Sequence, residues 1–331
     1  MEQEYFFGNN ENGIQLAQEK RKLRQIAMFI GIAMFITASV SLVFAPIYFN
    51  VLGLFGIDRY TATKFANDPM GMQLINQILS VLMFVFPFLI VISGCSFKFS
   101  DIVSLTRPDK KTFLPTVLIG LAFCGFANIA TNILASLFSG LGFEIPDYSI
   151  KTPDGPFGIA VMIIGAAFIA PLTEEFAMRG IVMGSLRKYG EKFAIISSAV
   201  LFGLMHGNIR QIPFAFIVGL ILGYAVIKTG SLWTGVAIHF INNLFASVIT
   251  IIGERLPEEI ALVLNLSFFA ICILCGFLSF LFTGNPKEET EIFTERDNLL
   301  TSKQSIKIFF TSPFIIAYVV VMVIETLLLM L

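Results

Sequence analysis

Long apolar runs separated by short polar segments dominate the pattern of this chain. A transmembrane helix needs about 20 mostly apolar residues, and nine runs approach or exceed that length. They cover residues 26–48, 75–94, 113–140, 157–184, 193–208, 211–228, 231–252, 260–283 and 308–331. The pattern therefore predicts an all-α fold, a polytopic membrane helix bundle with about eight or nine transmembrane helices.

The distribution of positive charges agrees with nine crossings. Lys and Arg concentrate in cytoplasmic loops of membrane proteins, so they should fill alternate segments of the chain. Of the 22 Lys and Arg residues, sixteen fall in one set of alternate segments, five fall in the other, and Arg179 lies inside a run. We therefore predict a cytoplasmic N-terminus and, with nine crossings, a C-terminus on the outer side.

Composition narrows the class of protein. The chain has 331 residues, of which 56% are hydrophobic and 14% charged, against roughly 25% charged in ordinary soluble domains. Its mean hydropathy is +0.82 and its net charge is −1. We expect an integral, multi-pass membrane protein, in the cell membrane if the source is bacterial. The lipid bilayer is its expected partner, and without a basic field no nucleic acid is expected.

A few ionisable residues interrupt the apolar runs. Each costs about 2.5–3.5 kcal/mol on insertion scales, so such residues are functional-site hypotheses. Glu174, Glu175 and Arg179 lie in the fourth run, His206 in the fifth and His239 in the seventh. The chain has two histidines, and both fall inside predicted spans. This clustering predicts a chemical site within the membrane.

The spacing of these residues suggests different roles. Glu175 and Arg179 are four residues apart, so they can form an ion pair along one helix face. Glu174 is then a carboxylate without a local cation, which suits a general base. Counting the helical rise from the cytoplasmic ends puts Glu174, His206 and His239 at about 15, 20 and 12 Å depth. These depths permit a shared site, nearer the cytoplasmic side.

Two further pairs are also four residues apart. Phe202 and His206 share one helix face, and so do His239 and Asn243. An imidazole beside a carboxamide offers two donors that can hold a developing oxyanion. Asn243 also has a simpler interpretation, a hydrogen bond between helices.

Three motifs on separate runs carry a family resemblance. The stretches EEFAMR, FGLMH and HFINN resemble the EExxxR, FxxxH and HxxxN motifs of the CAAX prenyl endopeptidase and bacteriocin-processing (CPBP, or Abi) family of intramembrane proteases. The resemblance implies that Glu174 and His206 activate a water molecule for attack on a peptide carbonyl. It further implies that His239 and Asn243 stabilise the oxyanion.

The resemblance covers about residues 155–252 and sets the domain organisation. Glu175, Arg179 and Phe202 would support the catalytic residues. The expected regions are a polar cytoplasmic N-terminus (1–25), N-terminal membrane helices (26–154), the catalytic core (155–252) and C-terminal membrane helices (253–331). The last region includes a polar linker at 284–307.

The expected activity is intramembrane hydrolysis of a peptide bond. The substrate would be a peptide or protein in or at the membrane, with or without a lipid modification, and no cofactor is expected. A zinc-dependent alternative stays open, because Glu174, His206 and His239 also supply a His₂Glu ligand set. A non-proteolytic scaffold or immunity protein and a proton-coupled transporter are alternatives from other classes.

Smaller features predict packing. Gly219 and Gly223 form a GxxxG pattern that suits close helix approach. Asn128, Thr131 and Asn132 are expected to bond neighbouring helices. Pro171, just before the two acids, should kink its helix.

Overall fold

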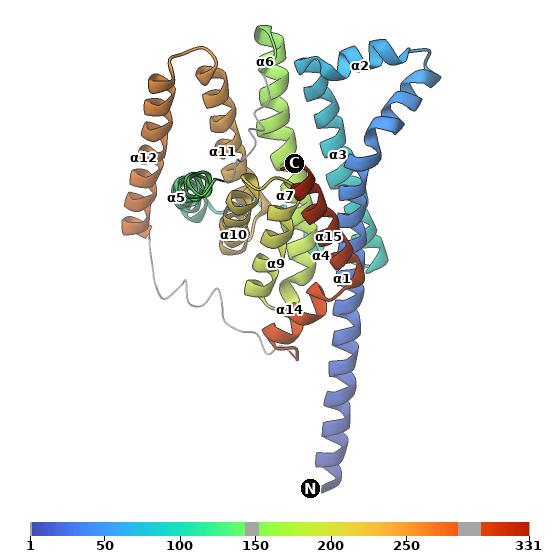
Figure 1. Cartoon of the computed structure of the whole chain (residues 1–331). Helices are drawn as coiled ribbons and strands as arrows, with labels where there is room; N and C mark the ends of the chain where they lie inside the picture. Colours follow the sequence, from blue (N-terminus) through green and yellow to red (C-terminus); the bar gives the residue numbers. More distant parts are fainter. Residues whose placement is uncertain (1, 143–151, 284–298, 331) are drawn as a thin grey trace.

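The computed structural model describes residues 2–142, 152–283 and 299–330, and regular structure in these ranges is helical throughout (Figure 1). The prediction of an all-α polytopic bundle is confirmed. The α-helices are α1 (Glu2–Leu54), α2 (Arg59–Asn67), α3 (Pro69–Gly94), α4 (Phe99–Ile102), α5 (Lys110–Gly140), α6 (Gly155–Ile163), α7 (Ala170–Glu175), α8 (Gly184–Leu186), α9 (Glu191–Leu204), α10 (Gln211–Thr229), α11 (Leu232–Gly253), α12 (Glu258–Thr283), α14 (Ser302–Phe310) and α15 (Pro313–Leu328).

Seven helical segments in the described part of the chain are long and apolar enough to cross a membrane, or up to eight if one bent pair counts as a span. The prediction was about eight or nine, so the upper count of eight agrees with it. The seven are Gly13–Val40 within α1, α3, α5, the continuous stretch Gly155–Tyr189, α10, α11 and Glu259–Leu281 within α12. The difference from nine comes from the two predicted runs at residues 193–208 and 308–331.

The run at 193–208 forms α9, which ends at Leu204 after 14 residues. At 1.5 Å per residue its length is about 21 Å, short of the roughly 30 Å hydrocarbon core. Its apolar composition has another cause, because it is packed inside the protein against α10 and the end of the Gly155–Tyr189 stretch. Burial in protein thus produced the same sequence signal as burial in lipid.

The last predicted run begins within α14, and α14 and α15 meet at a bend of 66°. Pro313 starts α15, and its missing N–H favours a new helix over a continued one. Of the predicted polar linker, residues 284–298 lie outside the described residues, while 302–307 belong to α14. Thr301 and Gln304 form a capping box that starts this helix.

The stretch that carries the two acids is an irregular helix. Two π-helical segments, Ile164–Ile169 and Phe176–Met183, flank α7. At the end of the first, the N–H of Ala170 bonds the carbonyl of Gly165, five residues back. Pro171 has no N–H to give the carbonyl of Ala166, so this carbonyl needs another donor. The irregularity of this helix therefore comes from Pro171 together with the wide π-helical turn that precedes it.

Four pairs of packed helices organise the bundle around the site. The long helix α1 runs past the rest of the bundle and packs against α3 and α15, while α9 packs on α10 and α5 on α12 (Figure 1). The predicted GxxxG pattern lies between α10 and α9: a Cβ on Gly219 would lie 3.0 Å from the Cα of Ala199, and one on Gly223 would lie 3.2 Å from a methyl carbon of Ile195. Close helix approach is confirmed there.

We expect Gly219→Leu to destabilise the protein, because the added side chain would enter the contact between α10 and α9. Overpacking of this kind costs about 1–3 kcal/mol. The melting temperature of purified protein in detergent measures it. Gly253→Leu is the control, since a Cβ at that residue would meet nothing within 4 Å. Equal melting temperatures for the two variants would contradict the close packing.

Candidate active site

One cavity of about 610 Å³ collects the four predicted catalytic residues. Glu174, His206, His239 and Asn243 all line it, together with Phe202. They come from α7, the turn after α9, and α11. Residues that are 69 positions apart in the sequence therefore face one space.

Behind the cavity wall lies the predicted ion pair. Arg179 Nη1 donates to Glu175 Oε1 over 2.8 Å, and both side chains have 0% exposure. Arg179 Nη2 also donates to the carbonyl of Gly219 over 3.3 Å, and its guanidinium carbon lies 4.1 Å from the centre of the Phe202 ring. The arginine thus contacts α10 and α9 as well as its own helix.

Glu175 has a second partner that the sequence did not suggest. Its Oε1 lies 3.1 Å from Nδ1 of His239, so one oxygen joins Arg179 to the imidazole. Its Oε2 has no hydrogen-bond partner and lies over Gly235, where a Cβ would come within 2.9 Å of it. Gly235 therefore gives the carboxylate the room it needs beside α11.

Glu174 is the carboxylate that reaches the cavity. Its side chain is 14% exposed, and its Oε2 lies 3.9 Å from Nε2 of His239, beyond hydrogen-bond length. The two acids and Arg179 would leave one uncompensated negative charge in a site that is largely buried. One extra proton, on Glu174 or on His239, makes the group neutral, which lowers the cost of burying it.

His206 is oriented by the end of α9. Its Nδ1 lies 2.8 Å from the carbonyl oxygen of Phe202, one of the carbonyls that a helix C-terminus leaves without a partner. A carbonyl can only accept, so Nδ1 carries the proton of the neutral ring and Nε2 is the acceptor. The imidazoles of His206 and His239 both meet the Phe202 ring edge-on, at centroid distances of 5.1 and 5.7 Å.

Asn243 supplies the donor that the irregular helix needs. Its Nδ2 donates to the carbonyl of Ala166 over 3.0 Å, the carbonyl that Pro171 cannot serve. The simpler interpretation of Asn243, a bond between helices, is therefore present in the structure. A carboxamide has two N–H groups, so this bond fixes the side chain and leaves a second donor.

The zinc alternative gains no support from this geometry. Three ligands would have to lie about 2.0–2.2 Å from a common point. Among the described residues, no three His, Cys, Asp or Glu side chains are grouped so that they could hold a metal ion. Glu174, His206 and His239 share a cavity without forming such a group.

Several cavity-lining residues were not predicted as site residues. They are carboxamides in otherwise apolar helices: Asn128, Asn132, Gln211, Asn242 and Asn265. The prediction that Asn128, Thr131 and Asn132 bond neighbouring helices is wrong for the bonds seen here. Asn132 donates to Asn128, and Thr131 donates to the backbone one turn back, all within α5. The signal that was missed is the presence of several Asn side chains within apolar helices, where they can line a cavity as well as bond another helix.

The cavity also reaches the end of the bundle that the sequence did not favour. Arg210 and Gln211 at the start of α10 and Thr250 near the end of α11 line it, and all three are exposed. The predicted topology puts these helix ends on the outer side. The expectation of a site nearer the cytoplasmic side depended on nine crossings, and it stays a prediction.

Comparisons with known proteins find similarity over part of the chain. Residues 156–245 match the profile of the Rce1-like family, described as type II CAAX prenyl endopeptidase. The family resemblance is confirmed. This segment contains all three motifs, and together with the apolar helices the match identifies an integral, multi-pass membrane protein.

Two bacterial relatives align with parts of the chain. The membrane-embedded CAAX protease MroQ of Staphylococcus aureus (strain USA300) is 24% identical over 156 residues, 45% of this chain and 63% of its own. YdiL of Bacillus subtilis (strain 168), named as a candidate membrane peptidase, is 26% identical over 91 residues, 27% of this chain and 37% of its own. The chain thus covers less than two thirds of either relative. No solved structure gave a significant match.

We expect Glu175→Gln to destabilise the fold by about 3–5 kcal/mol, because it leaves the charge of Arg179 buried without the carboxylate that it contacts. The free energy of unfolding in a denaturant titration measures this. Glu191→Gln is the matched control: its i,i+4 pair with Arg187 spans 3.3 Å with side chains 16% and 34% exposed, worth at most about 1 kcal/mol. Similar losses from both variants would contradict the buried character of the Glu175 pair.

Proposed function

We propose that this protein is an intramembrane endopeptidase that hydrolyses a peptide bond of a membrane-associated or lipid-modified substrate. One observation carries the proposal: Glu174, His206, His239 and Asn243, from three motifs, line one cavity. The match of residues 156–245 to the CAAX prenyl endopeptidases and the name of MroQ support a protease.

Glu174 and His206 are the proposed base groups. A water molecule in the cavity loses a proton to the Glu174 carboxylate while its oxygen bonds the scissile carbonyl carbon. Nε2 of His206, an acceptor because Nδ1 is held by Phe202, holds the other water hydrogen and orients the molecule. The proton then passes to the leaving nitrogen as the C–N bond breaks, so the base returns to its starting state.

His239 and Asn243 are the proposed oxyanion donors. The second N–H of the Asn243 carboxamide is available while the first is bonded to Ala166. His239 donates from Nε2 in its doubly protonated form, because Nδ1 faces Glu175. Two carboxylates flank that form, Glu174 and Glu175. Donors fixed before the reaction stabilise the developing charge without reorganisation.

The carboxamides of the cavity suit a peptide backbone. A carboxamide donates and accepts, as does each peptide unit, so Asn128, Asn132 and Asn265 can bond an extended segment. The same groups keep water at Glu174. A non-proteolytic scaffold or a transporter would not need these groups to surround a base and an oxyanion pair.

We expect Glu174→Gln to lower kcat/KM about 10²–10⁴-fold, the usual loss on removing a general base. The full-length protein in lipid vesicles would be given a fluorescence-quenched peptide with an S-farnesylated cysteine near its C-terminus, and the same peptide without the lipid. Glu259→Gln removes an exposed acid of α12 outside the cavity and should cut at the wild-type rate.

Three results would separate the alternatives. Wild-type cleavage by Glu174→Gln means that Glu174 is not the base. Activity lost to a chelator and restored by zinc means that the water is activated by a metal. The third result would indicate a scaffold. In that case the wild type cuts neither of the two peptides nor other membrane peptides, and its cellular effect survives both Glu174→Ala and His206→Ala.

We expect Asn132→Leu to raise KM for the peptide with little effect on stability, because Asn132 is exposed to the cavity and its bond stays within α5. Loss of one neutral hydrogen bond of about 0.5–1.5 kcal/mol corresponds to a two- to tenfold lower kcat/KM. Asn76→Leu is the matched control, an exposed asparagine of α3 away from the cavity. An unchanged KM in Asn132→Leu would contradict a role in backbone binding.

A further inference from the structure

The helix nearest the C-terminus, α15, reaches the turn that carries His206. It lies outside residues 156–245, the segment that matches the family profile, and it packs on α1 and on the end of α9 (Figure 1). Three of its buried side chains, Ile315, Tyr318 and Met322, are spaced by three and four residues, so they share one face of the helix. This face points into the bundle.

One hydrogen bond joins α15 to the last turn of α9. The carbonyls of such a turn have no N–H partner within the helix. The carbonyl of Phe202 bonds Nδ1 of His206 over 2.8 Å, so its direction sets that of the imidazole. The carbonyl of Leu201 accepts from the N–H of Met205 over 3.0 Å and from the hydroxyl of Tyr318 over 3.2 Å. The tyrosine therefore holds the backbone directly beside the group that orients His206.

A second contact lies at Gly207, the residue after His206. Its φ is +65°, a left-handed value that glycine adopts without strain. A Cβ at Gly207 would lie 3.3 Å from the terminal methyl carbon of Met322, so Met322 covers this turn. Tyr318 and Met322 are 1% and 4% exposed, and side chains in a close-packed interior hold their neighbours in place. The turn is thus supported by α15 on both sides of His206.

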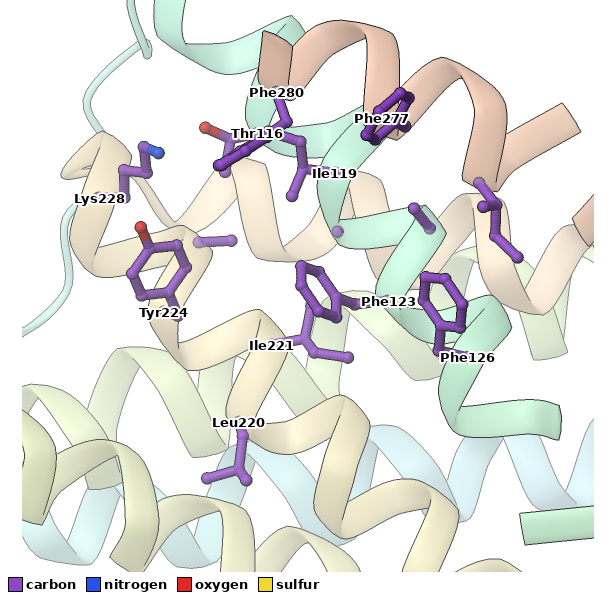
Figure 2. Close-up of a pocket in the computed structure, with 15 residues that line it drawn as sticks. Thr116, Ile119, Phe123, Phe126, Leu220, Ile221, Tyr224, Lys228, Phe277 and Phe280 are labelled. Carbon is purple, nitrogen blue, oxygen red and sulfur yellow. The ribbon is translucent and has the colours of Figure 1, made fainter. Parts of the chain in front are cut away.

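Another flank of the site is less closely packed. The helices α5, α10 and α12 border a second cavity of about 640 Å³ with a mostly apolar lining that includes Phe123, Phe126 and Phe277 (Figure 2). It shares no lining residue with the candidate active site. By contrast, Phe202 of α9 and Tyr318 of α15 belong to one buried apolar cluster. Close packing transmits a displacement and a cavity absorbs it, so α15 is the firmer support.

We infer that α15 positions His206, with Tyr318 as the positioning residue: its hydroxyl holds the last turn of α9, and this turn holds the imidazole. Tyr318 does not line the active-site cavity, so it acts through the backbone and not on the substrate. The consequence for catalysis rests on the proposed function, in which Nε2 of His206 orients the water. A misplacement of about 1 Å in such a group can cost about 100-fold in rate.

Histidine NMR tests the position of His206 without a substrate. The chain has two histidines, so the full-length protein with isotope-labelled histidine, purified by a tag without histidine and placed in lipid vesicles, gives ring signals from two residues. His206→Gln assigns them by removing one set. We expect Tyr318→Phe to shift the His206 signals away from those of the Nδ1–H tautomer, with little change at His239. Unchanged His206 signals would overturn the inference.

Tyr48→Phe is the matched control. It removes a hydroxyl that donates to the carbonyl of Ala62 over 3.0 Å, between α1 and α2, and it should leave the signals of both histidines as in the wild type. Tyr318→Phe should keep nearly the wild-type melting temperature, because the Leu201 carbonyl retains the N–H of Met205 as a donor. The melting temperature therefore separates a loss of folding from a loss of position.

Cleavage of the quenched peptide tests the consequence for catalysis. We expect Tyr318→Phe to lower kcat about tenfold with KM unchanged, because Tyr318 lies outside the cavity. In a His206→Gln background the same substitution should have no further effect, since Tyr318 acts through that imidazole. An unchanged kcat, or equal losses in both backgrounds, would overturn the inference. A wild type that cuts no peptide would refute the proposed function instead, and the histidine signals would still decide whether α15 positions His206.

Discussion

A carboxylate and a guanidinium with no exposed surface, Glu175 and Arg179, impose the constraint on which this site depends. Neither charge is tolerable in the membrane unless it is paired and hydrogen-bonded. The pair meets that need by contacts to other helices: Glu175 to His239 of α11, and Arg179 to the carbonyl of Gly219 of α10 and the ring of Phe202 of α9. Four segments are thereby fixed around one ion pair, and the cavity residues follow from their positions.

Backbone irregularity is the second consequence of placing chemistry inside a helix bundle. A carbonyl without a donor is expensive in a dry environment, yet the wide turn before Pro171 leaves one at Ala166. Asn243 satisfies it, and the same bond orients Asn243 toward the cavity. The carbonyl of Phe202 at the end of α9 fixes His206 in a comparable way. Unsatisfied backbone groups therefore position two of the four proposed catalytic side chains.

Local features of the site could be predicted from the sequence, and long-range ones could not. The Glu175–Arg179 pair depends on a spacing of four within one helix, and both histidines stood out because ionisable groups inside spans are rare. The contact between Glu175 and His239 joins positions 64 apart, and helix adjacency is absent from one sequence. Hydrophobicity also failed to separate α9, buried in protein, from a true span. Asn132 was misassigned because the sequence does not say whether a polar side chain faces a helix or a cavity.

The helices α5, α10 and α12 border two cavities of opposite character, and the residues between them explain how both can exist. Asn128 and Asn132 line the candidate active site, whereas Phe123 and Phe126 of the same helix line the other cavity. A cluster of apolar side chains fills the space where these helices meet α11: Val117, Leu121, Cys124, Val218, Leu222, Ala225, Ile238 and Cys272. Water that enters among the carboxamides therefore meets a close-packed apolar layer, in which it has no hydrogen-bond partners. The proposed hydrolysis needs water at Glu174, and this layer separates that water from the apolar cavity on the other side of the same helices.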